Sequence, residues 1–195
     1  LYTNTLGESN TSVGYTSLTL NTTGSGNTAY GTRSLVANVN GSYNTAIGNA
    51  SLFNNATGSI NTAVGNGALL ANNSGNGNTA IGAAALNNNT TGYSNVAIGV
   101  GALSTNTKAN NLVAIGDSAL FNNANGSTPG FILGVQNTAI GSKALFSNVF
   151  GGNNIALGLQ ALYSNNSGGS NVAIGVEAMY NNVAGANNTA NGYRA

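Results

Sequence analysis

Three carboxylates, Glu8, Asp117 and Glu177, are the acidic side chains of this sequence that could form a catalytic carboxylate pair. The sequence has no His and no Cys, so its many Ser and Thr hydroxyls have no imidazole or thiolate to work with. A catalytic pair of carboxylates must flank one substrate bond, and these three lie in widely separated parts of the chain. We therefore expect a protein that has no catalytic residues and is not an enzyme.

The residues needed for metal and phosphate sites are missing as well. Calcium-binding repeats place Asp at fixed positions, and this chain has a single Asp; zinc sites need Cys or His. Glycine pairs such as residues 24–26 lack the strand–helix context of a phosphate-binding loop. We expect no metal and no cofactor.

Charge and hydropathy exclude two further classes of partner. The chain has a net charge of +1 and four dispersed basic residues, Arg33, Lys108, Lys143 and Arg194. Nucleic acids and anionic membranes need several cations on one face, so we expect neither as a partner. No apolar run reaches the length of a spanning helix, and we expect no direct membrane insertion.

The sequence repeats every 17 residues, and this repeat determines where the side chains discussed above lie. A motif close to Asn-Thr-Ala-Ile-Gly recurs with its glycine at Gly14, Gly31, Gly48, Gly65, Gly82, Gly99, Gly116, Gly141, Gly158, Gly175 and Gly192; nine of the ten spacings are 17 residues and one is 25. A period this short and strict predicts a solenoid in which each repeat forms one coil. We expect an all-β parallel solenoid, a β-roll of about 11 coils. Residues 1–195 read as a single solenoid segment of a longer protein.

The residues before the motif glycine, which we number position 0, have the pattern of a short strand. Position −3 is Thr or a β-branched apolar residue, position −2 is Ala in all repeats but one, and position −1 is mostly Ile or Val. This alternation predicts a strand whose two sets of side chains point to opposite faces. We expect the residue at −1 and the Leu at +4 to form the buried apolar rows.

A second element carries Ala-Leu or Ser-Leu at positions +3 and +4. The pattern fits both a short strand and a single helical turn, and we favour the strand. We expect Asn at +7 to make one corner of the coil, because Asn tolerates a left-handed backbone. Gly at +10 is expected to make a second corner with positive φ.

The asparagines at +7 are predicted to form a structural ladder. Coils stacked about 4.8 Å apart would let each Asn side chain bond the coils above and below, as stacked Asn does in cross-β structures. The predicted ladder comprises Asn21, Asn38, Asn55, Asn72, Asn89, Asn106, Asn123, Asn148, Asn165 and Asn182.

Position +5 is a candidate contact for a partner or ligand. It carries aromatic residues in five repeats, Phe53, Phe121, Phe146, Tyr163 and Tyr180. These residues follow the buried Leu and should therefore face outward. An exposed aromatic row could pack against a sister chain or bind a carbohydrate.

Residues 127–136 are an insertion between two coils and a second candidate contact. The insertion holds the apolar residues Phe131, Ile132 and Leu133. We expect a loop that protrudes from one corner of the rod. It would either contact a partner or ligand, or fold back over its own rod.

The strand motif is similar to the head repeats of YadA-like trimeric autotransporter adhesins, which centre on Val-Ala-Ile-Gly. Residues 95–99, 113–116 and 171–175 carry this motif. The elements at residues 85–86 and 89–92 resemble related repeats of large bacterial surface proteins and phage tail fibres. The resemblance implies a left-handed β-roll, usually with three chains side by side, displayed outside the cell for attachment.

Two functions are expected from these patterns. The first is a non-enzymatic structural or adhesive module of an extracellular surface appendage, a bacterial or phage fibre. Such an adhesin would form an elongated rod of sister chains and attach to a ligand on a host or prey cell. The alternative is a ligand-binding solenoid, which would bind carbohydrate through the aromatic row or ice through the threonines at −3, namely Thr28, Thr45, Thr62 and Thr79.

Overall fold

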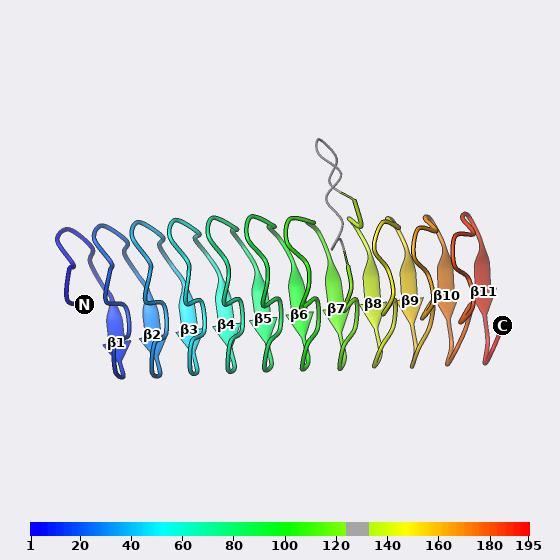
Figure 1. The fold of residues 1–195 in the computed structure, drawn as a ribbon, viewed down its shortest axis with the longest axis horizontal. Helices are drawn as coiled ribbons and strands as arrows, with labels where there is room; N and C mark the ends of the chain where they lie inside the picture. Colours follow the sequence, from blue (N-terminus) through cyan, green and yellow to red (C-terminus); the bar gives the residue numbers. More distant parts are fainter. Residues whose placement is uncertain (124–132) are drawn as a thin grey trace.

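The computed structural model describes residues 1–123 and 133–195 and confirms a parallel β-solenoid. Its coils lie side by side along one long axis, with the two termini at opposite ends of the rod (Figure 1). Each coil carries one three-residue strand: β1 (Thr11–Val13), β2 (Thr28–Tyr30), β3 (Thr45–Ile47), β4 (Thr62–Val64), β5 (Thr79–Ile81), β6 (Val96–Ile98), β7 (Val113–Ile115), β8 (Thr138–Ile140), β9 (Ile155–Leu157), β10 (Val172–Ile174) and β11 (Thr189–Asn191).

The eleven strands form one parallel sheet in chain order, and the register never slips. Equivalent residues face each other, as Ala46 faces Ala63 between β3 and β4. Backbone hydrogen bonds between coils continue outside the strands, for example from the Leu52 N–H to the Ala68 carbonyl at 2.9 Å. Neighbouring coils are therefore bonded around the coil as well as along the strand.

The second element is a turn, so the expected second strand is wrong. The backbone turns sharply because positions +2 and +4 both have positive φ, as in Ala50 (φ 52°) and Leu52 (φ 49°). Alternating left-handed residues allow neither an extended strand nor a helical turn. The left-handed Leu at +4 costs local strain, which its complete burial in the core offsets.

The expected corners also differ from those observed. The asparagines at +7 do not have positive φ; besides +2 and +4, the positions with positive φ are −5 and the motif glycine itself. The glycines at +10 do not need positive φ either. At Gly58, a Cβ would collide with the Asn55 side chain and the Gly75 carbonyl of the next coil, so close packing requires the glycine.

The apolar residue at position −1 faces outward, which corrects the expected core. The core is built from Ala at −2, Ala at +3 and Leu at +4, as in Ala63, Ala68 and Leu69, all with 0% exposure. Ile47 at −1 is 40% exposed. The coil is narrow, so the Leu from the opposite wall fills the space and leaves room only for Ala on the inner side of the strand.

The insertion leaves the rod continuous. Strands β7 and β8 pair with Val113 opposite Thr138, in the same register as all other pairs. Phe131 and Ile132 lie outside the described residues. Leu133 is half-buried, and Val135 packs against the core.

Candidate functional site

The predicted asparagine ladder is present along the rod. Each side-chain amide at +7 donates to the amide oxygen of the preceding coil, at 2.7 Å from Asn72 Nδ2 to Asn55 Oδ1. The same nitrogen donates to the glycine carbonyl at +10 of its own coil, at 3.0 Å from Asn72 to Gly75. The ladder crosses the insertion, because Asn148 donates to Asn123 at 2.9 Å. Its role is to hold the coils in register.

A second asparagine ladder, at position −4, is an element that the sequence reasoning missed. The Asn44 side chain donates to the Gly58 carbonyl at 2.8 Å, and its Oδ1 accepts from the Asn61 backbone N–H at 3.0 Å. Ten of eleven repeats carry this residue: Asn10, Asn27, Asn44, Asn61, Asn78, Asn95, Asn137, Asn154, Asn171 and Asn188. The column was visible in the sequence as the first residue of the motif.

The second ladder is interrupted once, beside the insertion. Leu112 takes the place of Asn, and Ala109 takes the place of the glycine in the same coil; both are fully buried. The Gly134 carbonyl, which Leu112 cannot bond, accepts from Asn137 at 3.1 Å instead. Leu112 and Ala109 therefore replace one step of the second ladder with apolar side chains. Among the described residues, no buried side-chain nitrogen or oxygen is left without a hydrogen-bond partner.

Four of the five predicted aromatic residues form a stack along the C-terminal coils. The ring centroids of Phe121, Phe146, Tyr163 and Tyr180 lie 5.5, 5.3 and 5.0 Å apart in turn, with interplanar angles of 15° or less. The rings are half-buried, as expected for outward-facing residues. Sugars stack on ring faces, and here the inner faces cover one another. The stack therefore presents ring edges to solvent, an arrangement that favours packing over carbohydrate binding.

Phe53 lies apart from the stack. Its ring is covered by the Arg33 guanidinium, whose central carbon is 4.8 Å from the ring centroid. In this cation–π contact the guanidinium covers one face of the Phe53 ring. Phe53 therefore does not extend the aromatic row.

The outward face of the sheet, which we call the strand face, is a further candidate surface. It consists of the side chains at −3 and −1 of every strand, which alternate with the buried Ala. Several large apolar residues on it are exposed, among them Ile47 (40%), Ile140 (40%) and Ile174 (38%). Contiguous exposed apolar surface of this kind marks interaction sites.

The strand face has two chemically different halves. Strands β2 to β5 carry Thr at −3, and we call this half the threonine face. Strands β6 to β10 carry Val or Ile at −3 except at Thr138, and we call this half the aliphatic face. The aliphatic residues at −3 are Val96, Val113, Ile155 and Val172.

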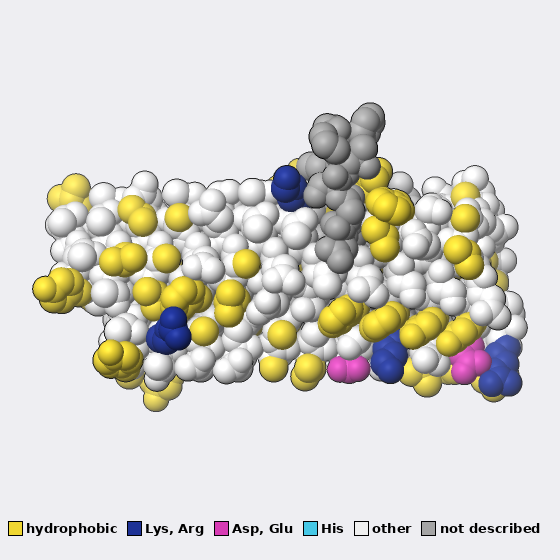
Figure 2. Space-filling view, viewed as in Figure 1, with side chains coloured by type: hydrophobic (Ala, Val, Ile, Leu, Met, Phe, Trp, Pro, Cys, Tyr) yellow, Lys and Arg dark blue, Asp and Glu magenta, His cyan; other side chains and the backbone are white. Residues whose placement is uncertain are grey.

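Charged residues border the aliphatic half of the rod. Asp117, Lys143, Glu177 and Arg194 follow strands β7, β8, β10 and β11 at positions +1 or +2. Figure 2 shows charged side chains of both signs along one edge of the rod towards its C-terminal end. Arg194 Nε lies 2.6 Å from Glu177 Oε2, and this hydrogen bond raises the pKa of the Arg194 guanidinium. An apolar face with a mixed-charge border resembles the core and rim of a protein interface.

The carboxylates do not come together. Glu8 precedes β1, Asp117 follows β7, and Glu177 follows β10, so separate coils hold them. Within residues 1–123 and 133–195, no cluster of three or more His, Cys, Asp or Glu side chains could hold a metal ion. The part of the chain that the structure describes has no helix able to cross a lipid bilayer.

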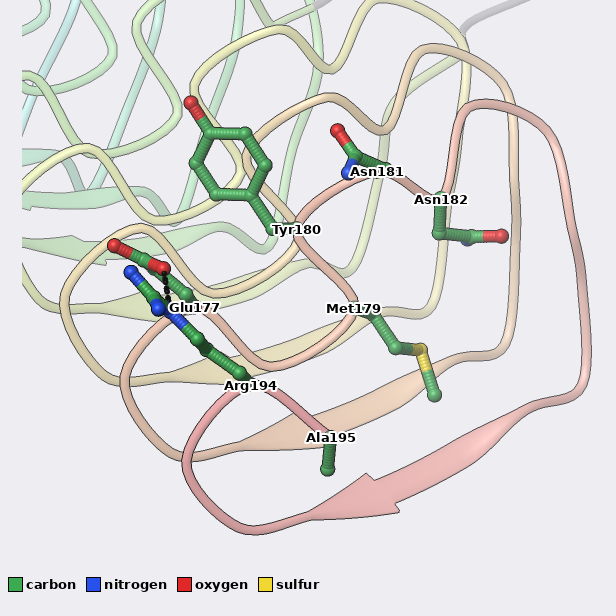
Figure 3. Close-up of a pocket in the computed structure, with 7 residues that line it drawn as sticks. All are labelled: Glu177, Met179, Tyr180, Asn181, Asn182, Arg194 and Ala195. Atoms are coloured by element: carbon green, nitrogen blue, oxygen red, sulfur yellow. Dashed lines mark hydrogen bonds and ion pairs between the residues drawn. The ribbon is translucent and has the colours of Figure 1, made fainter.

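A hollow of about 440 Å³ lies at the end of the last coil. Figure 3 shows Met179 pointing into the coil interior and the Glu177–Arg194 pair at one side. Met179 takes the place of the fully buried Leu of other repeats and is half-buried. The hollow is lined by Glu177, Met179, Tyr180, Asn181, Asn182, Arg194 and Ala195.

Comparisons with protein-family models, curated proteins and solved structures find no match for this chain. The resemblance to YadA-like heads therefore rests on the repeat motif alone. What it implies about handedness, assembly and localisation stays a prediction.

Proposed function

We propose that this chain is a non-enzymatic, rod-shaped module of an extracellular surface appendage, which assembles with sister chains and attaches to another surface. The observation that carries the proposal is the aliphatic face, an exposed apolar surface bordered by charges of both signs. A surface of nearly zero net charge suits contact with an identical chain, because neither partner brings an excess of like charge. The extracellular setting and a trimer are suggested by the resemblance to YadA-like heads.

Rigidity supports the structural part of the proposal. Two asparagine ladders and a parallel sheet run through the described coils in register. Each repeat contributes a small core that only its neighbours complete, so length can be added without new kinds of contact. Such a rod suits a spacer that presents a binding surface away from the cell.

Charge placed on the aliphatic face is expected to separate the sister chains. We would combine Ile140→Lys with Ile174→Lys, since both side chains already face solvent in the single chain and their replacement should leave the coil folded. Burying two lysines at an apolar contact carries a large desolvation cost. Light scattering coupled to size-exclusion chromatography should find several chains in the wild-type particle and one chain in the variant.

Val39→Lys is the matched control. Val39 is 37% exposed and lies at +8, away from the strand face. The control should keep the wild-type mass. A wild-type protein that is monomeric at all accessible concentrations would contradict the proposed assembly.

A further inference from the structure

The threonine face carries a row of hydroxyls without a protein partner. Thr28, Thr45, Thr62 and Thr79 stand at the same position of neighbouring strands, each directly opposite the next. They are half-buried and face outward. Other threonines of the rod bond the backbone, as the Thr22 hydroxyl bonds the Val39 carbonyl at 3.0 Å. Among the described residues, the four in this row have no such bond, so water must satisfy them.

The surroundings of this row are mostly apolar, with one cation at the edge of the strand face. Position −1 of the same strands carries Tyr30, Ile47, Val64 and Ile81, which place an apolar row parallel to the hydroxyls. The nearest cation along the chain, Arg33, is engaged over the Phe53 ring. Water beside this face would therefore contact mainly hydroxyl and methyl groups.

The spacing of the row is fixed by the fold. Neighbouring hydroxyls repeat at the inter-strand distance of about 4.8 Å, which is close to the repeat of oxygen atoms along the a axis of ordinary ice. Both asparagine ladders pass through these coils and keep the strands from shifting, as in the bond of 2.8 Å from Asn55 to Asn38. A rigid array loses little entropy when it binds an ordered lattice.

We propose that the threonine face binds ice, which makes ice the surface to which the module attaches. The inference rests on the proposed attachment role. It concerns the threonine face, whereas the proposed contact between sister chains uses the aliphatic face. Thr hydroxyls would join the ordered water layer, and the methyl groups beside them would fit between its molecules.

Thermal hysteresis of the whole chain tests the inference, with crystal shape seen by microscopy as a second readout. The wild-type protein should separate the freezing and melting points and facet growing ice crystals. The double variant Thr45→Val with Thr62→Val keeps the shape but removes two hydroxyls, and the variant Thr62→Lys adds a hydrated charge. Both should lose most of the hysteresis. Thr57→Val and Thr57→Lys are the matched controls, because Thr57 is exposed at +9, off the strand face.

Circular dichroism would first establish that each variant is folded. Absence of hysteresis and faceting in the wild-type protein would overturn the inference, even if light scattering finds the sister-chain assembly. Dissociation of the assembly by Thr62→Lys would also overturn it, because the threonine face would then be a contact between chains. Loss of the assembly in the variant that combines Ile140→Lys with Ile174→Lys, with hysteresis intact, is the expected result, because the aliphatic face holds the sister chains and the threonine face binds ice.

Discussion

Replacing Gly65 with alanine is expected to separate two neighbouring coils of the rod. Gly65 has φ of 134°, a conformation that is essentially restricted to glycine, and a Cβ there would lie 2.6 Å from the Gly82 carbonyl oxygen and 2.7 Å from its carbon. Neither obstacle is a flexible side chain, so the backbone of the next coil must move. The backbone strain and the clash together should lower the free energy of unfolding by about 4 kcal/mol. Urea denaturation followed by circular dichroism would measure the loss.

Gly77→Ala is the matched control for this substitution. Gly77 has φ of 65°, in the left-handed region that some non-glycine residues adopt, and its nearest neighbour would be the Ser94 hydroxyl at 3.9 Å. The equivalent position is Ser in other repeats, including Ser9 and Ser94 with φ near the same value. The control should cost only about 1 kcal/mol. If Gly65→Ala and Gly77→Ala lowered the free energy of unfolding equally, close packing of the coils at Gly65 would not stabilise the rod.

Replacing Asn55 with alanine is expected to lower the free energy of unfolding substantially, because it removes one complete member of the ladder. Asn55 is fully buried, donates to Asn38 Oδ1 and to the Gly58 carbonyl, both at 2.8 Å, and accepts from Asn72 at 2.7 Å. Three hydrogen bonds disappear, and the Asn38 oxygen is left buried without this donor. The loss should be about 3 kcal/mol, measured by urea denaturation.

Asn54→Ala is the matched control, because it makes the same substitution at an asparagine outside the ladder. Asn54 precedes the ladder residue and its side chain is exposed. Its replacement should alter the free energy of unfolding by no more than about 0.5 kcal/mol. Similar losses for Asn54→Ala and Asn55→Ala would argue against a stabilising ladder.

The architecture and the first ladder could be predicted because they depend on periodicity alone. Identical residues recur every 17 positions, and stacking coils in register must place Asn21 beside Asn38 whatever the path of the chain between them. The partial exposure of the aromatic residues at +5 could be predicted for a similar reason, because they follow a Leu that has to be buried.

The cross-section of the coil could not be predicted in the same way. Alternation in the strand defines two faces but not which one is inside, and hydrophobicity alone wrongly favoured Ile47 over Ala46 as the core residue. Which face of the strand is buried depends on the space between the strand and the opposite side of the coil. That space is filled by Leu52, which lies in a turn. The turn itself needs a left-handed Leu, which local preferences disfavour and tertiary packing imposes.

The two candidate surfaces exist because Ala at −2 is buried and the residue at −1 faces outward. Because Ile140 and Ile174 point away from the core, the strand face becomes an exposed apolar surface and not a buried row. The threonines at −3 share the outward face for the same reason, since residues two apart in a strand lie on one side. If position −1 is assumed to be buried, neither the aliphatic face nor the threonine face is predicted.

The mass per unit length of the particle in solution tests the central claim most directly. Small-angle X-ray scattering gives this quantity for a rod, and the single chain has a mass of 19.2 kDa. Ten steps between the eleven strands make a rod about 50 Å long. An assembly of sister chains side by side predicts a particle of this length with an integral multiple, greater than one, of the single-chain mass per unit length. A value equal to that of one chain, whether in a single rod or in rods joined end to end, would contradict it.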